Sequence, residues 1–75
     1  MEQSHTFHSE TADVQVSSLM EALGDRPFYC IVTGHGDLPV ESYTVTAAYP
    51  FIAAQEALDL YKEKHSLNLS EVWAL

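Results

Sequence analysis

Residues 27–48 read PFYCIVTGHGDLPVESYTVTAA, two β-prone runs on either side of a Gly-rich connection. The first run, from Phe28 to Thr33, is aromatic and β-branched with few polar positions, which is typical of a central strand. The second run, from Val40 to Ala48, alternates Tyr, Val and Ala with Ser and Thr, the pattern of a strand with one buried and one exposed face. The short connection predicts that the two runs pair as an antiparallel hairpin.

A helix is predicted directly after the hairpin, from Pro50 to His65. Proline suits the first helical turn, where its missing N–H would have no partner in any case. The predicted buried face consists mainly of small residues that allow close packing on a sheet: Ala53, Ala54, Ala57, Leu58 and Tyr61. Glu56, Asp59, Lys62 and Glu63 are expected to face solvent.

An earlier helix is predicted from about Asp13, because Val16, Leu19, Met20 and Leu23 recur at helical spacing and Gly24 follows as a stop. In the alternative interpretation, Val14 and Val16 belong to a strand and only residues 18–23 are helical, with Ser17 as the cap. Residues 1–12 are rich in Ser, Thr and His and are expected to be a flexible arm without regular structure.

The end of the chain predicts a third strand within residues 67–75, which include Val72, Trp73 and Leu75. A right-handed crossover through the long helix would set this strand parallel to the second one, with the apolar first strand between them. The expected fold is therefore α+β, a three-stranded sheet of order 3-1-2 in an α-β-β-α-β arrangement with a helix on one face. Residues 13–75 would form one domain.

The chain is strongly acidic: three Lys and Arg oppose eleven Asp and Glu, for a net charge of −8. So few cations cannot form a nucleic-acid groove, and the charge disfavours anionic membranes. A basic protein surface is the natural complement. A single cysteine, Cys30, and an N-terminus without the features of a secretory signal suggest a cytoplasmic protein.

The residues with catalytic or metal-binding chemistry form no recognisable site. His35 and Asp37 lie in a turn that accounts for them, and His5 and His8 lie in the expected arm. Cys30 has no neighbouring cation to activate it. We therefore expect no enzyme activity, no metal and no cofactor.

The carboxylates could form an anionic strip if they share an exposed side, although a plain solvating surface explains them as well. The expected partner-binding residues are Asp37, Glu41, Glu56, Asp59, Glu63 and, as exposed aromatic surface, Trp73.

The segment from Thr44 to Ala57, TVTAAYPFIAAQEA, joins the hairpin to the long helix. From Phe28 onward the size, acidity and strand-helix plan resemble small phage-encoded proteins of the anti-CRISPR type. The resemblance implies an inhibitor that masks the basic, nucleic-acid-binding surface of a bacterial defence complex. If the protein is phage-encoded, it is expected in the host bacterial cytoplasm.

Together these features predict a non-enzymatic inhibitor or regulator that binds a bacterial protein complex. The alternative is a small structural module that self-associates through its sheet, for example as a homodimer. A partner contact made by charges should weaken with salt, whereas pairing through the sheet should not.

Overall fold

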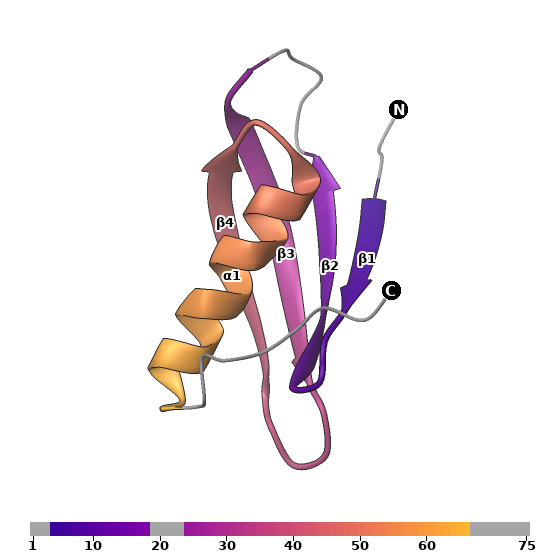
Figure 1. Cartoon of the computed structure of the whole chain (residues 1–75), viewed down its shortest axis with the longest axis vertical. Helices are drawn as coiled ribbons and strands as arrows, with labels where there is room; N and C mark the ends of the chain where they lie inside the picture. Colours follow the sequence, from indigo (N-terminus) through magenta and orange to yellow (C-terminus); the bar gives the residue numbers. More distant parts are fainter. Residues whose placement is uncertain (1–3, 19–23, 67–75) are drawn as a thin grey trace.

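The computed structural model describes residues 4–18 and 24–66, which form one sheet and one helix. The elements follow the chain as β1 (Ser4–His8), β2 (Ala12–Ser18), β3 (Arg26–Gly34), β4 (Val40–Ala47) and α1 (Pro50–Lys64). All neighbouring strands are antiparallel and the sheet order is β1-β2-β3-β4, with α1 lying across one face (Figure 1).

The predicted hairpin is confirmed as β3 and β4. Phe28 lies opposite Val45 and Cys30 opposite Tyr43, so residues of the same parity share a face of the sheet. The even positions of β3 and the odd positions of β4 point toward α1. Together with β2 and α1 they form a core of Ala12, Val14, Val16, Phe28, Cys30, Val32, Val45, Ala47, Ala53, Ala54, Ala57, Leu58 and Tyr61.

The predicted long helix is also confirmed. Ala53, Ala54 and Ala57 are fully buried, because small side chains let α1 approach the sheet closely. Lys62, which was expected to face solvent, is only 1% exposed. It follows Leu58 by four residues and therefore lies on the same side of the helix as that core residue.

The predicted fold is wrong in its sheet: the structure has four antiparallel strands and one helix, not a three-stranded sheet of order 3-1-2 in an α-β-β-α-β arrangement. Residues 13–18 belong to β2 and not to a helix. Ala12, Val14 and Val16 are fully buried, whereas Gln15 between them is exposed. This period of two fits a strand with one side under α1, as the alternative interpretation of Val14 and Val16 held.

The strand beside β3 is therefore β2, which takes the place that the predicted order gave to a C-terminal strand. The central position of β3 is confirmed, since β2 and β4 flank it. The predicted third strand at residues 67–75 and the predicted helical residues 19–23 lie outside the described residues.

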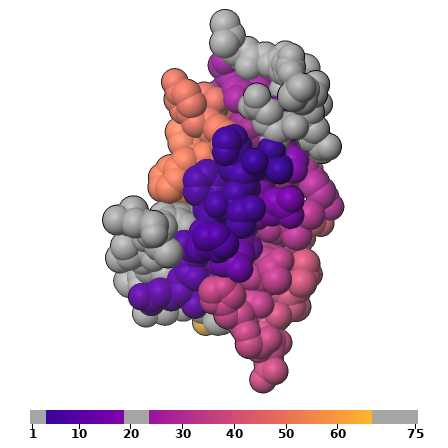
Figure 2. All heavy atoms as spheres, turned by 90° about the vertical axis from the view of Figure 1, so that its right-hand side faces the viewer, coloured from indigo at the N-terminus to yellow at the C-terminus, as the bar shows by residue number. Residues whose placement is uncertain are grey.

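A strand also forms within residues 1–12, for which no regular structure was expected. β1 pairs with β2 along its whole length, from Ser4 opposite Ser17 to His8 opposite Asp13. Phe7 is the large apolar side chain of β1 that packs against the core. Seen from this edge, the residues of β1 cover the side of the sheet and the β3–β4 loop projects at one end (Figure 2).

The face of the sheet that points away from α1 is mostly polar and uncharged. One row across it consists of Thr6, Gln15, Ile31 and Ser42, which lie opposite one another in the register. Among the described residues, Asp13 is the one carboxylate on this face; the others lie on α1, on the α1 side of β4 or in the connections between elements. No helix within the described residues is long and apolar enough to cross a membrane.

Candidate functional site

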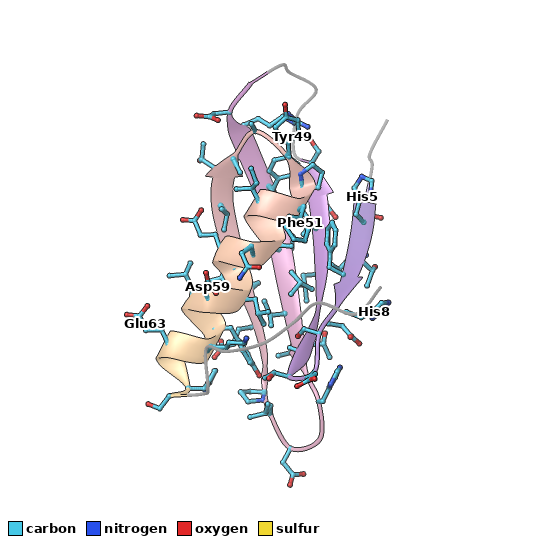
Figure 3. The ribbon with its side chains drawn as sticks, in the orientation of Figure 1. His5, His8, Tyr49, Phe51, Asp59 and Glu63 are labelled. Atoms are coloured by element: carbon cyan, nitrogen blue, oxygen red, sulfur yellow. The ribbon has the colours of Figure 1, made fainter. Side chains whose placement is uncertain are left out.

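The outer surface of α1 carries the candidate binding site. Most of its exposed residues recur along one side of the helix, which faces away from the sheet, while the exposed Lys64 in the last turn is paired with Glu41. We call this set the acidic helix face: Ile52, Glu56, Asp59, Leu60 and Glu63. Asp59 and Glu63 project from the same side of α1 (Figure 3).

Three carboxylates of this face lack a basic partner within the described residues. Glu56, Asp59 and Glu63 are all exposed, and none of them takes part in an ion pair there. Asp59 accepts a hydrogen bond of 3.0 Å from Nε2 of Gln55, one turn earlier. Since Gln55 is neutral, this contact orients the carboxylate without cancelling its charge.

Two aliphatic side chains accompany these charges. Ile52 is 48% exposed and Leu60 is 41% exposed. Sequence reasoning missed both as site residues, although their helical spacing relative to Glu56 and Glu63 could have indicated them. Apolar positions among carboxylates give a partner something to bury as well as something to attract.

Glu41, another predicted site residue, is engaged inside the molecule. It lies half-buried on the α1 side of β4, where Oε2 is 2.8 Å from Nζ of Lys64 and 3.0 Å from Nε2 of His65. The hydrogen bond from Lys64 is the main reason that the pKa of Glu41 lies below its ordinary value, and the same bond raises the pKa of Lys64. Glu41 therefore ties β4 to the end of α1 and adds little to an anionic surface.

The remaining predicted residues do not join the acidic helix face. Asp37 is exposed on the loop between β3 and β4, and Trp73 lies outside the described residues. The structure thus brings together three of the six predicted residues, namely Glu56, Asp59 and Glu63.

A second exposed group lies at the start of α1. Tyr49 and Phe51 are 67% and 49% exposed, and both lie near the first turn of the helix (Figure 3). The ring of Phe51 meets Phe7 of β1 edge to face, with centroids 5.7 Å apart. This contact holds the Phe51 ring against β1, and Phe51 directly precedes Ile52 of the acidic helix face.

Cys30, the one cysteine of the chain, lies in the core and not on the acidic helix face. Cys30 is fully buried, and burial raises the pKa of its thiol to about 11, with a smaller contribution from the charge of Glu56. A thiol in that state is a core side chain and not a nucleophile. Among residues 4–18 and 24–66, no group of three or more His, Cys, Asp or Glu side chains is placed to hold a metal ion.

Two tyrosines near the end of α1, Tyr61 on the helix itself and Tyr43 on β4, differ in their hydrogen bonding. The Tyr61 hydroxyl donates to the main-chain oxygen of Pro39 over 2.7 Å. The Tyr43 hydroxyl is buried and has no partner within the described residues. Burial also raises the pKa of both phenols.

We expect Tyr61→Phe to lower the free energy of unfolding by about 1 kcal/mol, because it leaves the Pro39 oxygen without its donor. Tyr43→Phe should leave it unchanged or raise it by up to about 1 kcal/mol, because it removes an unpaired buried hydroxyl. Urea denaturation followed by circular dichroism measures both. Equal losses in the two variants would contradict this assignment, since they would show that the Tyr43 hydroxyl is also paired.

In comparisons with known proteins, no family model, curated protein or solved structure matches this chain.

Proposed function

We propose that this chain is a non-enzymatic protein that inhibits or regulates a partner by docking the acidic helix face on the partner's basic surface. The observation that supports this most directly is the row formed by Glu56, Asp59 and Glu63, exposed and without basic partners in the described part of the chain. A solvated surface of mixed sign would intersperse Lys and Arg among these positions.

The same helix face supplies the two contributions that a protein contact needs. The carboxylates attract a basic surface from a distance and raise the association rate. Ile52 and Leu60 offer apolar area to bury once the surfaces meet. A helix presenting anchors at such spacing fits a groove on a partner protein.

The partner that this surface suits is a bacterial complex whose basic surface ordinarily holds nucleic acid. A groove lined with Arg and Lys for phosphates would accept carboxylates in their place. The net charge of −8 supports such a partner, and the resemblance to anti-CRISPR proteins would make it a CRISPR effector in the bacterial cytoplasm. Three basic residues are too few for the chain to bind nucleic acid itself.

The test begins with affinity capture from bacterial lysate at low and high salt, followed by binding measurements on the purified partner. We expect Glu56→Lys, Asp59→Lys and Glu63→Lys each to weaken binding, by roughly threefold to tenfold at low salt. Glu10→Lys is the matched control, because it makes the same charge change at an exposed position away from α1. It should lower affinity much less than any of the three.

Equal weakening by Glu10→Lys and the helix variants would mean that only the net charge matters, and would refute the acidic helix face as the docking site. Binding that does not change between low and high salt would refute the charge-based contact itself.

A second candidate function, self-association, rests on the outer edge of β4. This strand is the last of the sheet, and its residues Val40, Ser42, Thr44 and Thr46 are exposed. β4 contains neither Lys nor Pro, which commonly block pairing at a sheet edge, and its one charged side chain, Glu41, is paired with Lys64 and His65. Sedimentation at increasing protein concentration separates the two functions, because only self-association gives a salt-independent increase in mass.

A further inference from the structure

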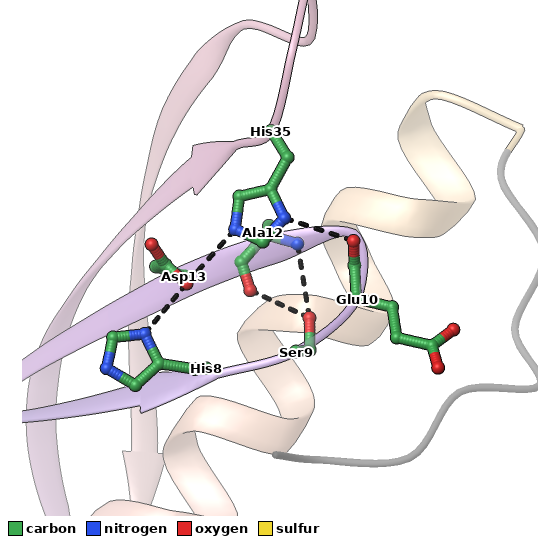
Figure 4. A network of polar contacts seen from close by, with 6 residues as sticks. All are labelled: His8, Ser9, Glu10, Ala12, Asp13 and His35. Carbon is green, nitrogen blue, oxygen red and sulfur yellow. Dashed lines mark hydrogen bonds and ion pairs between the residues drawn. The ribbon is translucent and has the colours of Figure 1, made fainter.

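Three segments that are distant in sequence meet at the end of the sheet from which the β3–β4 loop projects. They are the end of β1 with its turn into β2, the start of β2, and His35 just after β3 (Figure 4). The main-chain N–H of His35 donates to the oxygen of Thr11 over 2.9 Å. This bond holds the His35 ring beside the β1–β2 turn.

The His35 ring contacts an acceptor at each of its nitrogens. Nε2 lies 3.1 Å from Oδ1 of Asp13, and Nδ1 lies 3.0 Å from the main-chain oxygen of Glu10. A carboxylate oxygen and a carbonyl oxygen can only accept. A neutral imidazole has one N–H and one lone pair, so it can satisfy only one of these contacts, whereas an imidazolium donates to both.

We propose that His35 is a proton-dependent latch, which fastens the β3–β4 loop to the β1–β2 turn when its ring carries two protons and releases one contact when it carries one. Loss of either proton breaks one of the two contacts, because it leaves a ring lone pair facing an oxygen lone pair at 3.0 or 3.1 Å, which is repulsive.

Among the described residues, the carboxylate in contact with the His35 ring is that of Asp13, and its negative charge favours the doubly protonated form. Asp13 supplies a carboxylate from β2, and the same Oδ1 accepts a hydrogen bond of 2.9 Å from Nδ1 of His8 on β1. These bonds, first from His8 and then from His35, lower the pKa of Asp13. Glu10 faces the ring with its main-chain oxygen and turns its carboxylate away (Figure 4), and Asp37 is exposed further along the loop.

The pH range over which the latch holds follows from the titration of Asp13 and His35. Asp13, with a lowered pKa in the folded protein, contributes stability that is complete above its ordinary pKa and is lost as the pH falls from there through the lowered pKa. His35, which gains two acceptors on folding, contributes stability that is complete in weak acid and is lost as the pH rises through neutrality. The loop that the latch holds carries Asp37, and its Pro39 receives the hydrogen bond from Tyr61.

The test is a pH titration of the histidine rings in the ¹⁵N-labelled full chain, followed by long-range ¹H–¹⁵N correlation. We expect both His35 ring nitrogens to be protonated at a pH about one unit above the titration midpoint of the same residue in the urea-unfolded chain. A folded midpoint equal to the unfolded one, or a single-proton tautomer throughout weak acid, would overturn the proposal.

Two variants separate the latch from general packing. Asp13→Asn keeps an acceptor of the same shape but removes the charge, and should shift the His35 midpoint to lower pH; no shift would overturn the proposal. His8→Gln removes the other ring that contacts Oδ1 of Asp13. It should leave the titration midpoint of His35 at or above that of the unmodified chain. A fall with His8→Gln as large as that with Asp13→Asn would also overturn it.

A stability measurement gives an independent readout. Between about pH 5.5 and pH 8.5 the urea midpoint of the unmodified chain should fall more steeply than that of His35→Gln, whose amide does not titrate. Parallel curves for the two proteins would contradict the latch even if the rings titrate as expected.

Discussion

Replacing Gly34 by alanine should lower the free energy of unfolding by about 3 kcal/mol. Gly34 ends β3 on the side that faces α1. An added methyl group would overlap both the Tyr61 hydroxyl and the Cβ atom of Leu38. Neither can easily move: the hydroxyl is bonded to the Pro39 oxygen, and Leu38 is packed against the core. The variant must therefore shift α1, the β3–β4 loop or both.

Gly36→Ala provides the control, since it adds the same methyl group two residues later. Gly36 has a positive φ of 66°, but a Cβ there would meet no atom within 4 Å. It should cost about 1 kcal/mol for its backbone conformation alone. Urea denaturation of both variants gives the comparison. A loss at Gly34 no larger than the loss at Gly36 would show that the loop and α1 do not press on β3 as described.

The elements predicted correctly are those in which local pattern and tertiary environment agree. The hairpin of β3 and β4 combines β-prone residues with a turn, and α1 combines a proline start with a continuous alanine-rich face. Each pattern extends over enough residues to exclude the other type of structure. Neither required knowledge of what packs against it.

The segment around Val16 could not be resolved in this way, because two periods share it. Val16 belongs to the helical series Val16, Leu19, Met20 and Leu23, and equally to the alternating series Ala12, Val14 and Val16. Pairing with β1 and β3 on both sides selects the strand for residues 12–18. β1 itself has little local signal, since Phe7 is its one large apolar residue, and it depends on β2 for its partner.

For the candidate site, too, the sequence pattern predicts which residues share one element but not which residues from distant elements meet. Helical spacing was sufficient to predict that Glu56, Asp59 and Glu63 share a face. The pairing of Glu41 with Lys64 and His65 joins residues more than twenty positions apart, so nothing near Glu41 in the sequence indicates that its charge is already used. The double acceptor environment of His35 likewise comes from the distant Glu10 and Asp13.

Val14→Asp is expected to abolish folding or to lower the free energy of unfolding by about 4 kcal/mol or more, a large part of the total for a domain of this size. Val14 is fully buried on β2, opposite Phe7 on one side and Val32 on the other. A carboxylate there would lie among apolar side chains beneath α1. In a helix with Val16 on its buried face, position 14 would instead lie about 200° away and would tolerate the change.

Gln15→Asp is the matched control, because it introduces the same side chain one residue later on the exposed face. Gln15 lies between Thr6 and Ile31, and its replacement should lower the free energy of unfolding by no more than about 1 kcal/mol, the range of strand propensities. Thermal and urea denaturation followed by circular dichroism measure both variants. If Val14→Asp yields no folded protein, Val14→Ala should still fold with a loss of about 2 kcal/mol. Tolerance of Val14→Asp equal to that of Gln15→Asp would refute the placement of β2 under α1, and with it the four-stranded sheet that holds the acidic helix face outward.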